Sequence, residues 1–176
     1  MRRLAQTVLP FAVLLSLLAP RTAHAQGTAE LTLDGPETSR TAVLDAHFAT
    51  GVDSLRGGEN TFALYFYDEA YGESQKWAWI ARTGGSPSPG TYTFSTLTRG
   101  GPLADSTFTL GGELNASERG RPVMLVSTQG GTLTIDTATE DRIEGSFQVD
   151  NLMGGTITGT FNAPRGTFRG TRGPGG

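Results

Sequence analysis

Cysteine is absent from this chain of 176 residues, and histidine and lysine are rare. Without cysteine the chain can form no disulfide bond, carry no lipid on a cysteine and build no zinc site from His and Cys. Its stability must come from its core alone. Because His47 is the only histidine after residue 25, a Ser-His-Asp arrangement in that part of the chain would have to use it.

Long apolar runs are also missing. The longest, Val8–Ala19, has 12 residues and is shorter than the roughly 20 that cross a bilayer as a helix. Arginines precede it at the start of the chain, and Ala23-His24-Ala25 follows with the small residues of a cleavage site. This pattern predicts that residues 1–25 are a signal peptide. We therefore expect an exported protein, periplasmic or extracellular, with no membrane span after cleavage and no lipid anchor.

Positive charge is scarce in the expected mature chain. Residues 26–176 contain 11 basic and 17 acidic residues, a net charge of −6. This balance disfavours nucleic acid and anionic membranes as partners. The length indicates one domain, for which we expect residues 26–164. Residues 165–176, rich in Gly and Arg, have no core-forming pattern and are predicted to be a flexible tail.

After residue 25 no segment has the apolar period of an amphipathic helix; the period is two almost throughout. In "TFALYFYD", for example, Phe62, Leu64 and Phe66 share one face of a strand. Turn signals recur every 8 to 14 residues, and the 25 glycines and many threonines fit strands and turns. We predict an all-β fold: an antiparallel β-sandwich or partly closed β-barrel of about ten strands.

The sequence "RIEGSFQVDNLMGGTITGTF" contains the pattern I-x-G-x-F twice. In extended strands each copy places its Ile, Gly and Phe on one face. A hairpin around residues 150–154 would keep both apolar sets together and pair Phe147 with Ile157, Gly145 with Gly159 and Ile143 with Phe161. Cross-strand pairs of this kind contribute about 0.2–1 kcal/mol each. The repeat is therefore predicted to be architectural.

The C-terminal half resembles a family of exported bacterial β-proteins and lipoproteins of uncharacterised function. The resemblance covers roughly residues 84–164 and implies an all-β fold but no activity. The chain departs from the lipoprotein members because it has no cysteine for lipidation. The motifs that carry the resemblance are Gly90-Thr91-Tyr92 with Phe94; Gly131, Leu133 and Ile135; Arg142-Ile143 with Gly145 and Phe147; and Gly159, Phe161, Ala163 and Pro164.

Candidate catalytic and metal-binding groups are few. Asp45 and His47 share a strand face, but no G-x-S-x-G motif supplies a nucleophile, so a solvent-facing histidine is the favoured interpretation. Paired carboxylates could hydrolyse sugars, and segments such as "DEAYGE" and "DTATED" could hold calcium, although neither has the spacing of a dedicated loop. Asn115-Ala-Ser117 matches a glycosylation sequon by coincidence. The acidic candidates are Asp68, Glu69, Glu73, Asp136, Glu140 and Asp141.

Four aromatic residues form the candidate ligand-binding strip. Tyr65 and Tyr67 share one face of their strand, and Trp77 and Trp79 share one face of the next. If Phe62 and its neighbours point inward, the tyrosines point outward or into a groove, while the tryptophans either join the core or extend the strip. Exposed Tyr and Trp stack on sugar rings or anchor protein partners.

We expect a non-enzymatic exported module with a binding or structural role at the bacterial envelope. A glycan or a protein of the cell envelope is the expected partner, with no cofactor and no metal. One alternative is a barrel that carries a small apolar ligand, which would need an enclosed cavity. Another is a carbohydrate-active enzyme with converging carboxylates. The oligomeric state stays open.

Overall fold

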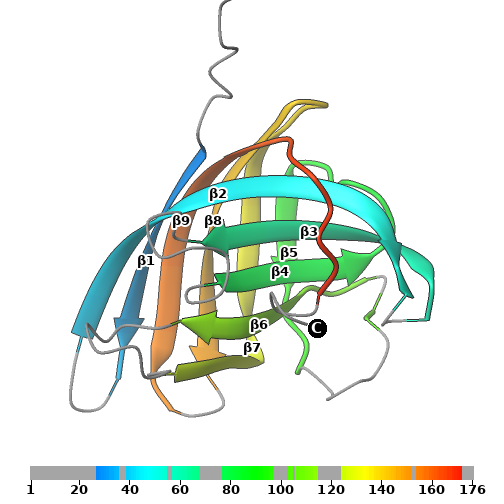
Figure 1. Cartoon of the computed structure of the whole chain (residues 1–176). Coiled ribbons are helices and arrows are strands. Elements are labelled where there is room, and N and C mark those ends of the chain that lie inside the picture. The colour runs from blue at the N-terminus through cyan, green and yellow to red at the C-terminus, as the bar shows by residue number, and fades with distance from the viewer. Residues whose placement is uncertain are drawn as a thin grey trace, which may run out of the picture.

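The computed structural model consists of β-strands and loops, and the part of the chain that it describes contains no helix (Figure 1). The expected signal peptide, the sequon and the acidic residues 68, 69 and 73 lie outside the described residues. In the described part, no helix has the length and apolarity needed to cross a membrane. The described residues are 27–35, 39–54, 57–67, 77–96, 103–104, 106–114, 124–151 and 154–171.

The nine strands of the described residues all belong to one antiparallel sheet. Its order is β5-β7-β6-β4-β3-β2-β1-β9-β8, and β7, the strand next to the end strand β5, also pairs with β8 at the other end of the series. The sheet curls strongly into a half-barrel (Figure 1). The all-β, antiparallel prediction is confirmed; a two-sheet sandwich is not seen. The strands are β1 (Gly27–Asp34), β2 (Ser39–Asp53), β3 (Glu59–Tyr67), β4 (Trp77–Thr83), β5 (Gly90–Thr93), β6 (Thr109–Leu114), β7 (Met124–Ala138), β8 (Arg142–Asn151) and β9 (Thr156–Pro164).

The main core fills the inner face of the curl. Alternation places Phe62, Leu64 and Phe66 of β3 there, as the sequence predicts, and each is at most 1% exposed. Burial of each such side chain contributes roughly 1.5–3 kcal/mol. The aromatic members of this core are Phe48, Phe62, Phe66, Phe94, Phe108, Phe147 and Phe161.

The two copies of I-x-G-x-F form β8 and β9, a hairpin whose apolar side chains face this core. Both repeated rings converge on Phe66 of β3, with centroid distances of 5.8 Å for Phe147 and 6.3 Å for Phe161. The architectural role is confirmed, but the predicted register is wrong by two residues. Phe147 pairs with Gly159 and Phe161 pairs with Gly145, so each ring lies opposite a glycine.

The turn of the hairpin explains this register. Asp150 pairs with Thr156, and the Asn151 amide donates to the Gly155 carbonyl oxygen at 3.0 Å. Gly154 and Gly155 both have positive φ, 94° and 83°, a conformation that glycine adopts without steric cost. The chain therefore reverses one residue later than predicted, and a shift of the turn centre by one residue changes the pairing by two.

Candidate functional site

An open groove of about 440 Å³ lies on the outer face of the sheet, across β1, β9, β8 and β7. The polar residues of these strands point outward because the alternation turns their apolar neighbours into the core. Six hydroxyl groups dominate the lining, and it carries one charged side chain. The lining side chains are Glu30, Thr32, Thr132, Thr134, Ser146, Gln148, Thr158 and Thr160, with Phe147 and Gly159 also contributing.

The strand register arranges these groups in two rows that run across the strands. In the first row, Thr158 of β9 lies between Thr32 of β1 and Gln148 of β8, and Thr132 of β7 follows. In the second row, the corresponding order is Glu30, Thr160, Ser146 and Thr134. Neighbouring strands are about 4.8 Å apart, so each row extends about 14 Å from β1 to β7. The groove therefore presents evenly spaced donors and acceptors along an extended path.

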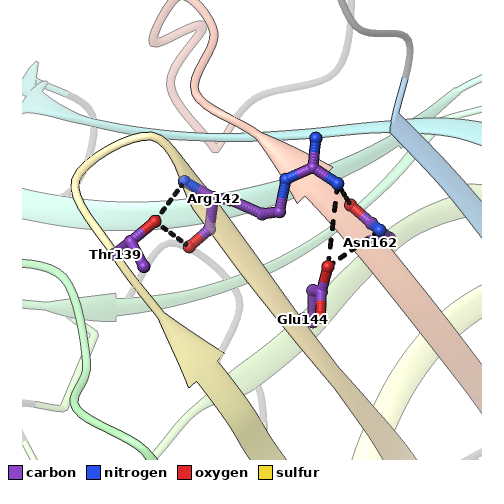
Figure 2. A network of polar contacts seen from close by, with 4 residues as sticks. All are labelled: Thr139, Arg142, Glu144 and Asn162. Atoms are coloured by element: carbon purple, nitrogen blue, oxygen red, sulfur yellow. Dashed lines mark hydrogen bonds and ion pairs between the residues drawn. The ribbon is translucent and has the colours of Figure 1, made fainter.

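A polar network lies on the same outer face, next to the second row (Figure 2). The Asn162 side chain accepts a hydrogen bond from Arg142 Nη1 at 2.8 Å and donates one to Glu144 Oε1 at 2.9 Å. Arg142 and Glu144 also form an ion pair at 3.6 Å. Thr139 Oγ1 accepts from the Arg142 amide at 3.0 Å and closes the turn between β7 and β8. This network fixes the charged side chains of β8 beside the groove.

The structure brings three members of the predicted aromatic strip to one face of the sheet. Tyr65 and Trp79 belong to a second core cluster on the outer side of β2, β3 and β4, and Tyr67 packs against it. Two of these side chains are closed to solvent, since Tyr65 is 0% and Trp79 3% exposed. The backbone of Trp77 pairs with Tyr67 and Glu113. The buried rings of Tyr65 and Trp79 therefore present no open face for a sugar.

Residues 165–171 cover the cluster, crossing the outer face of β2 and β3 after β9 ends (Figure 1). This segment is part of the predicted flexible tail, and it lies against the sheet through hydrogen bonds, while residues 172–176 lie outside the described part. The prediction of a solvent-facing His47 is wrong, because the segment leaves it 6% exposed. Its Nε2–H donates to the Thr167 carbonyl oxygen at 3.1 Å, and its ring stacks on Tyr65 with a centroid distance of 4.8 Å.

Burial changes the acidity of two groups in this cluster. Desolvation lowers the pKa of His47 below its ordinary value of 6.5; the bond to Thr167 opposes this, and the positive charge of Arg169 adds to it. Desolvation also raises the pKa of Tyr65 to about 12. Both groups are therefore uncharged at neutral pH beneath the segment.

The remaining acidic candidates do not form a described site. Asp136 is exposed on β7, and Glu140 and Asp141 are exposed in the turn before β8. Glu140 forms an ion pair with Arg165 at 3.7 Å, at the surface. Within the described ranges, no group of three His, Asp or Glu side chains is placed to hold a metal ion.

Sequence reasoning missed both the groove and the covering segment. The groove has a sequence signal, because the pattern T-x-T occurs on the polar face of two of its strands, β7 and β9. Comparisons of the chain with family models, curated proteins and solved structures found no match. The resemblance to exported β-proteins therefore stays a prediction.

Proposed function

We propose that this chain is an exported, non-enzymatic binding module whose outer groove holds a segment of a neutral glycan. The observation that carries the proposal is the pair of hydroxyl-rich rows across β1, β9, β8 and β7. Export is supported by the pattern of residues 1–25. Tyr65 and Trp79 of the aromatic strip, which pointed to glycans in the sequence, are buried, so the groove takes the place of the strip in the proposal.

The chemistry of the lining favours a glycan over other ligands. A hydroxyl group both donates and accepts, so the groove suits a ligand whose own donors and acceptors alternate without fixed polarity, as sugar hydroxyls do. Glu30 is the one charged lining residue, which disfavours an anionic ligand. Threonine methyl groups add small apolar contacts for the C–H faces of sugar rings. Because each row is about 14 Å long, several linked rings fit better than a single sugar.

The two alternatives have no such support. An apolar-ligand carrier would bind its ligand inside the curl, where the described inner face is packed with the side chains of the main core. A carbohydrate-active enzyme would need two converging carboxylates, and Glu30 is the one carboxylate in the groove lining. A bound glycan that is recovered uncleaved after long incubation would separate a binding module from a hydrolase.

The test is a glycan array with the mature domain, followed by calorimetric titration of the glycans retained. Thr158→Val with Thr160→Val removes two hydroxyls at nearly constant volume and keeps strand propensity, so the fold should survive. We expect at least a tenfold loss of affinity. Thr28→Val is the matched control, since Thr28 is exposed on β1 outside the groove and should leave binding unchanged. Equal affinity of the double variant and the control would remove the groove from the proposal, and a folded domain that retains no glycan would refute it.

A further inference from the structure

Residues 165–171 contact the sheet in the way that a bound peptide contacts its binding site. The Gly166 amide donates to the Phe48 carbonyl oxygen at 2.8 Å, and Phe48 and Arg165 form a parallel β-bridge. One residue after Gly166, the Thr167 carbonyl oxygen accepts from His47 Nε2. The segment therefore enters the face along β2 through its backbone, in the way that an added peptide binds a sheet.

The second half of the segment is held by two polar side chains of the sheet. Tyr65 Oη accepts a hydrogen bond from the Arg169 amide at 3.0 Å and donates one to the Gly170 carbonyl oxygen at 3.1 Å. Asp53 Oδ2 accepts from both the amide and the hydroxyl of Thr171, at 3.0 and 2.6 Å. A hydrogen bond to a carboxylate is stronger than one between neutral groups, so Thr171 is the most firmly held residue of the segment.

The sheet also accommodates the side chains of Phe168 and Arg169. Phe168 packs over Gly51, where a Cβ atom would lie 2.5 Å from the phenyl ring, and meets Tyr65 edge to face at 6.4 Å. The Arg169 guanidinium lies 5.5 Å from the centre of the Tyr67 ring, a cation–π contact. Because Gly51 has no side chain, it leaves space on the sheet for an aromatic ring, and the face of the Tyr67 ring can bind a cation.

We propose that the outer face of β2 and β3 is a peptide-binding site, that residues 165–171 are its resident ligand, and that an extended segment of another polypeptide with the same Phe-Arg-Gly-Thr pattern can replace them. The pattern follows from the contacts. The Phe ring packs on Gly51, and the Arg side chain lies against the Tyr67 ring. The carbonyl oxygen of the small Gly residue accepts from Tyr65, and the Thr hydroxyl donates to Asp53. This site is distinct from the groove across β1, β9, β8 and β7.

The attached segment competes with any such partner. A short tether gives the resident ligand an effective concentration on the order of millimolar, so a free peptide binds the intact protein far more weakly than an opened one. Opening the site without changing its sheet residues is therefore the decisive step. Phe168→Ser with Thr171→Ala in the full chain weakens the resident segment and leaves Gly51, Asp53 and Tyr65 in place.

The experiment titrates the synthetic peptide RGTFRGT, residues 165–171, into this full-chain variant, followed by calorimetry and by amide shifts of β2 and β3. We expect one-site binding with a dissociation constant on the order of 100 µM and at least tenfold weaker binding to the unchanged chain. Two altered peptides form a matched pair. Thr171→Ala in the peptide should cost at least fivefold, whereas Thr167→Ala should have no effect, because only the backbone of Thr167 is used.

A second variant keeps the test decisive if the double substitution disturbs folding. The chain ended after Pro164 should bind the same peptide, and Asp53→Asn in that background should weaken binding at least fivefold. If either opened protein is folded by circular dichroism and gives no saturable binding of RGTFRGT, the proposal is wrong. It is equally wrong if the Thr167→Ala and Thr171→Ala peptides bind alike, or if the opened face takes sugars and not the peptide.

Discussion

The ring of Phe147 occupies the space that a side chain at position 159 would need. A Cβ atom on Gly159 would lie 2.6 Å from Cε1 of that ring, and the two residues face each other across the β8–β9 ladder. The reciprocal pair repeats the arrangement, since a Cβ on Gly145 would lie 2.9 Å from Cζ of Phe161. Glycine opposite an aromatic residue lets the ring lie over the strand and seals the backbone from water.

Gly159→Ala should therefore destabilise the protein by about 1–3 kcal/mol, because the added methyl group pushes Phe147 out of its place against Phe66. Urea unfolding followed by circular dichroism measures this. Gly130→Ala is the control: a Cβ at that position in β7 would meet no atom within 4 Å. Its stability should stay within about 0.5 kcal/mol of the original chain. Equal losses of stability in the two variants would show that the lost flexibility of glycine, and not the contact with the Phe147 ring, causes the destabilisation.

The network of Figure 2 should contribute little to stability although its geometry is good. Arg142 and Glu144 are 41% and 37% exposed, and ion pairs at this exposure contribute about 0–1 kcal/mol. We expect Asn162→Thr, which suits a strand but cannot bridge the two charges, to change the free energy of unfolding by less than about 1 kcal/mol. The difference from the original chain should shrink further in 1 M NaCl. A loss above about 2 kcal/mol would contradict this account of the network.

Tyr65→Phe removes the hydroxyl group that joins the sheet to the covering segment. The change leaves the Arg169 amide and the Gly170 carbonyl without this partner, at an expected cost of about 1–3 kcal/mol in segment docking. Hydrogen exchange at the Arg169 amide measures the effect and should become at least fivefold faster. Tyr92→Phe loses a tyrosine hydrogen bond of 2.7 Å at an exposed site, to Ser88, and should leave exchange at Arg169 unchanged.

Alternation predicted the two faces of the sheet but not the pairing along it. The period of two placed Phe62 inward and Tyr65 on the opposite face, and both positions are confirmed. A register shift of two residues leaves every side chain on its predicted face, so the pattern could not distinguish Phe147 opposite Ile157 from Phe147 opposite Gly159. The turn determines the register, because its two glycines adopt positive φ angles.

The covering segment had no sequence signal of this kind. It contains one large apolar residue, Phe168, and its strongest anchor, Asp53, lies 118 positions from Thr171. Such a contact depends on the assembled sheet, where Asp53 and Tyr65 come to the same face. The groove was more predictable. Its rows follow from the alternation of polar and apolar residues, with T-x-T in β7 and β9, once the order of β1, β9, β8 and β7 is known.

Acid should loosen the covering segment through His47. Burial beneath the segment lowers the pKa of the imidazole, with Arg169 acting in the same direction, so the docked state favours neutral histidine. Release of the segment returns the ring to water and its pKa toward 6.5. Above that pH the imidazole is neutral in both the docked and the released state, so protonation does not weaken docking. Below it, the released state takes up a proton that the docked state resists, and docking weakens by at most about tenfold per pH unit.

The measurement is the rate of trypsin cleavage after Arg165 and Arg169 in protein pre-incubated at pH values from 7.5 to 5, with hydrogen exchange at Arg169 as the second readout. We expect exposure of the segment to rise as the pH falls through the range below 6.5. His47→Gln keeps a side-chain N–H for the Thr167 carbonyl oxygen but cannot titrate, so its exposure should be the same at every pH in this range. A pH dependence that persists in His47→Gln would assign the acid response to another group. No pH dependence in the original chain would mean that the segment stays docked over a protonated imidazole, against the direction in which burial and Arg169 move the pKa of His47.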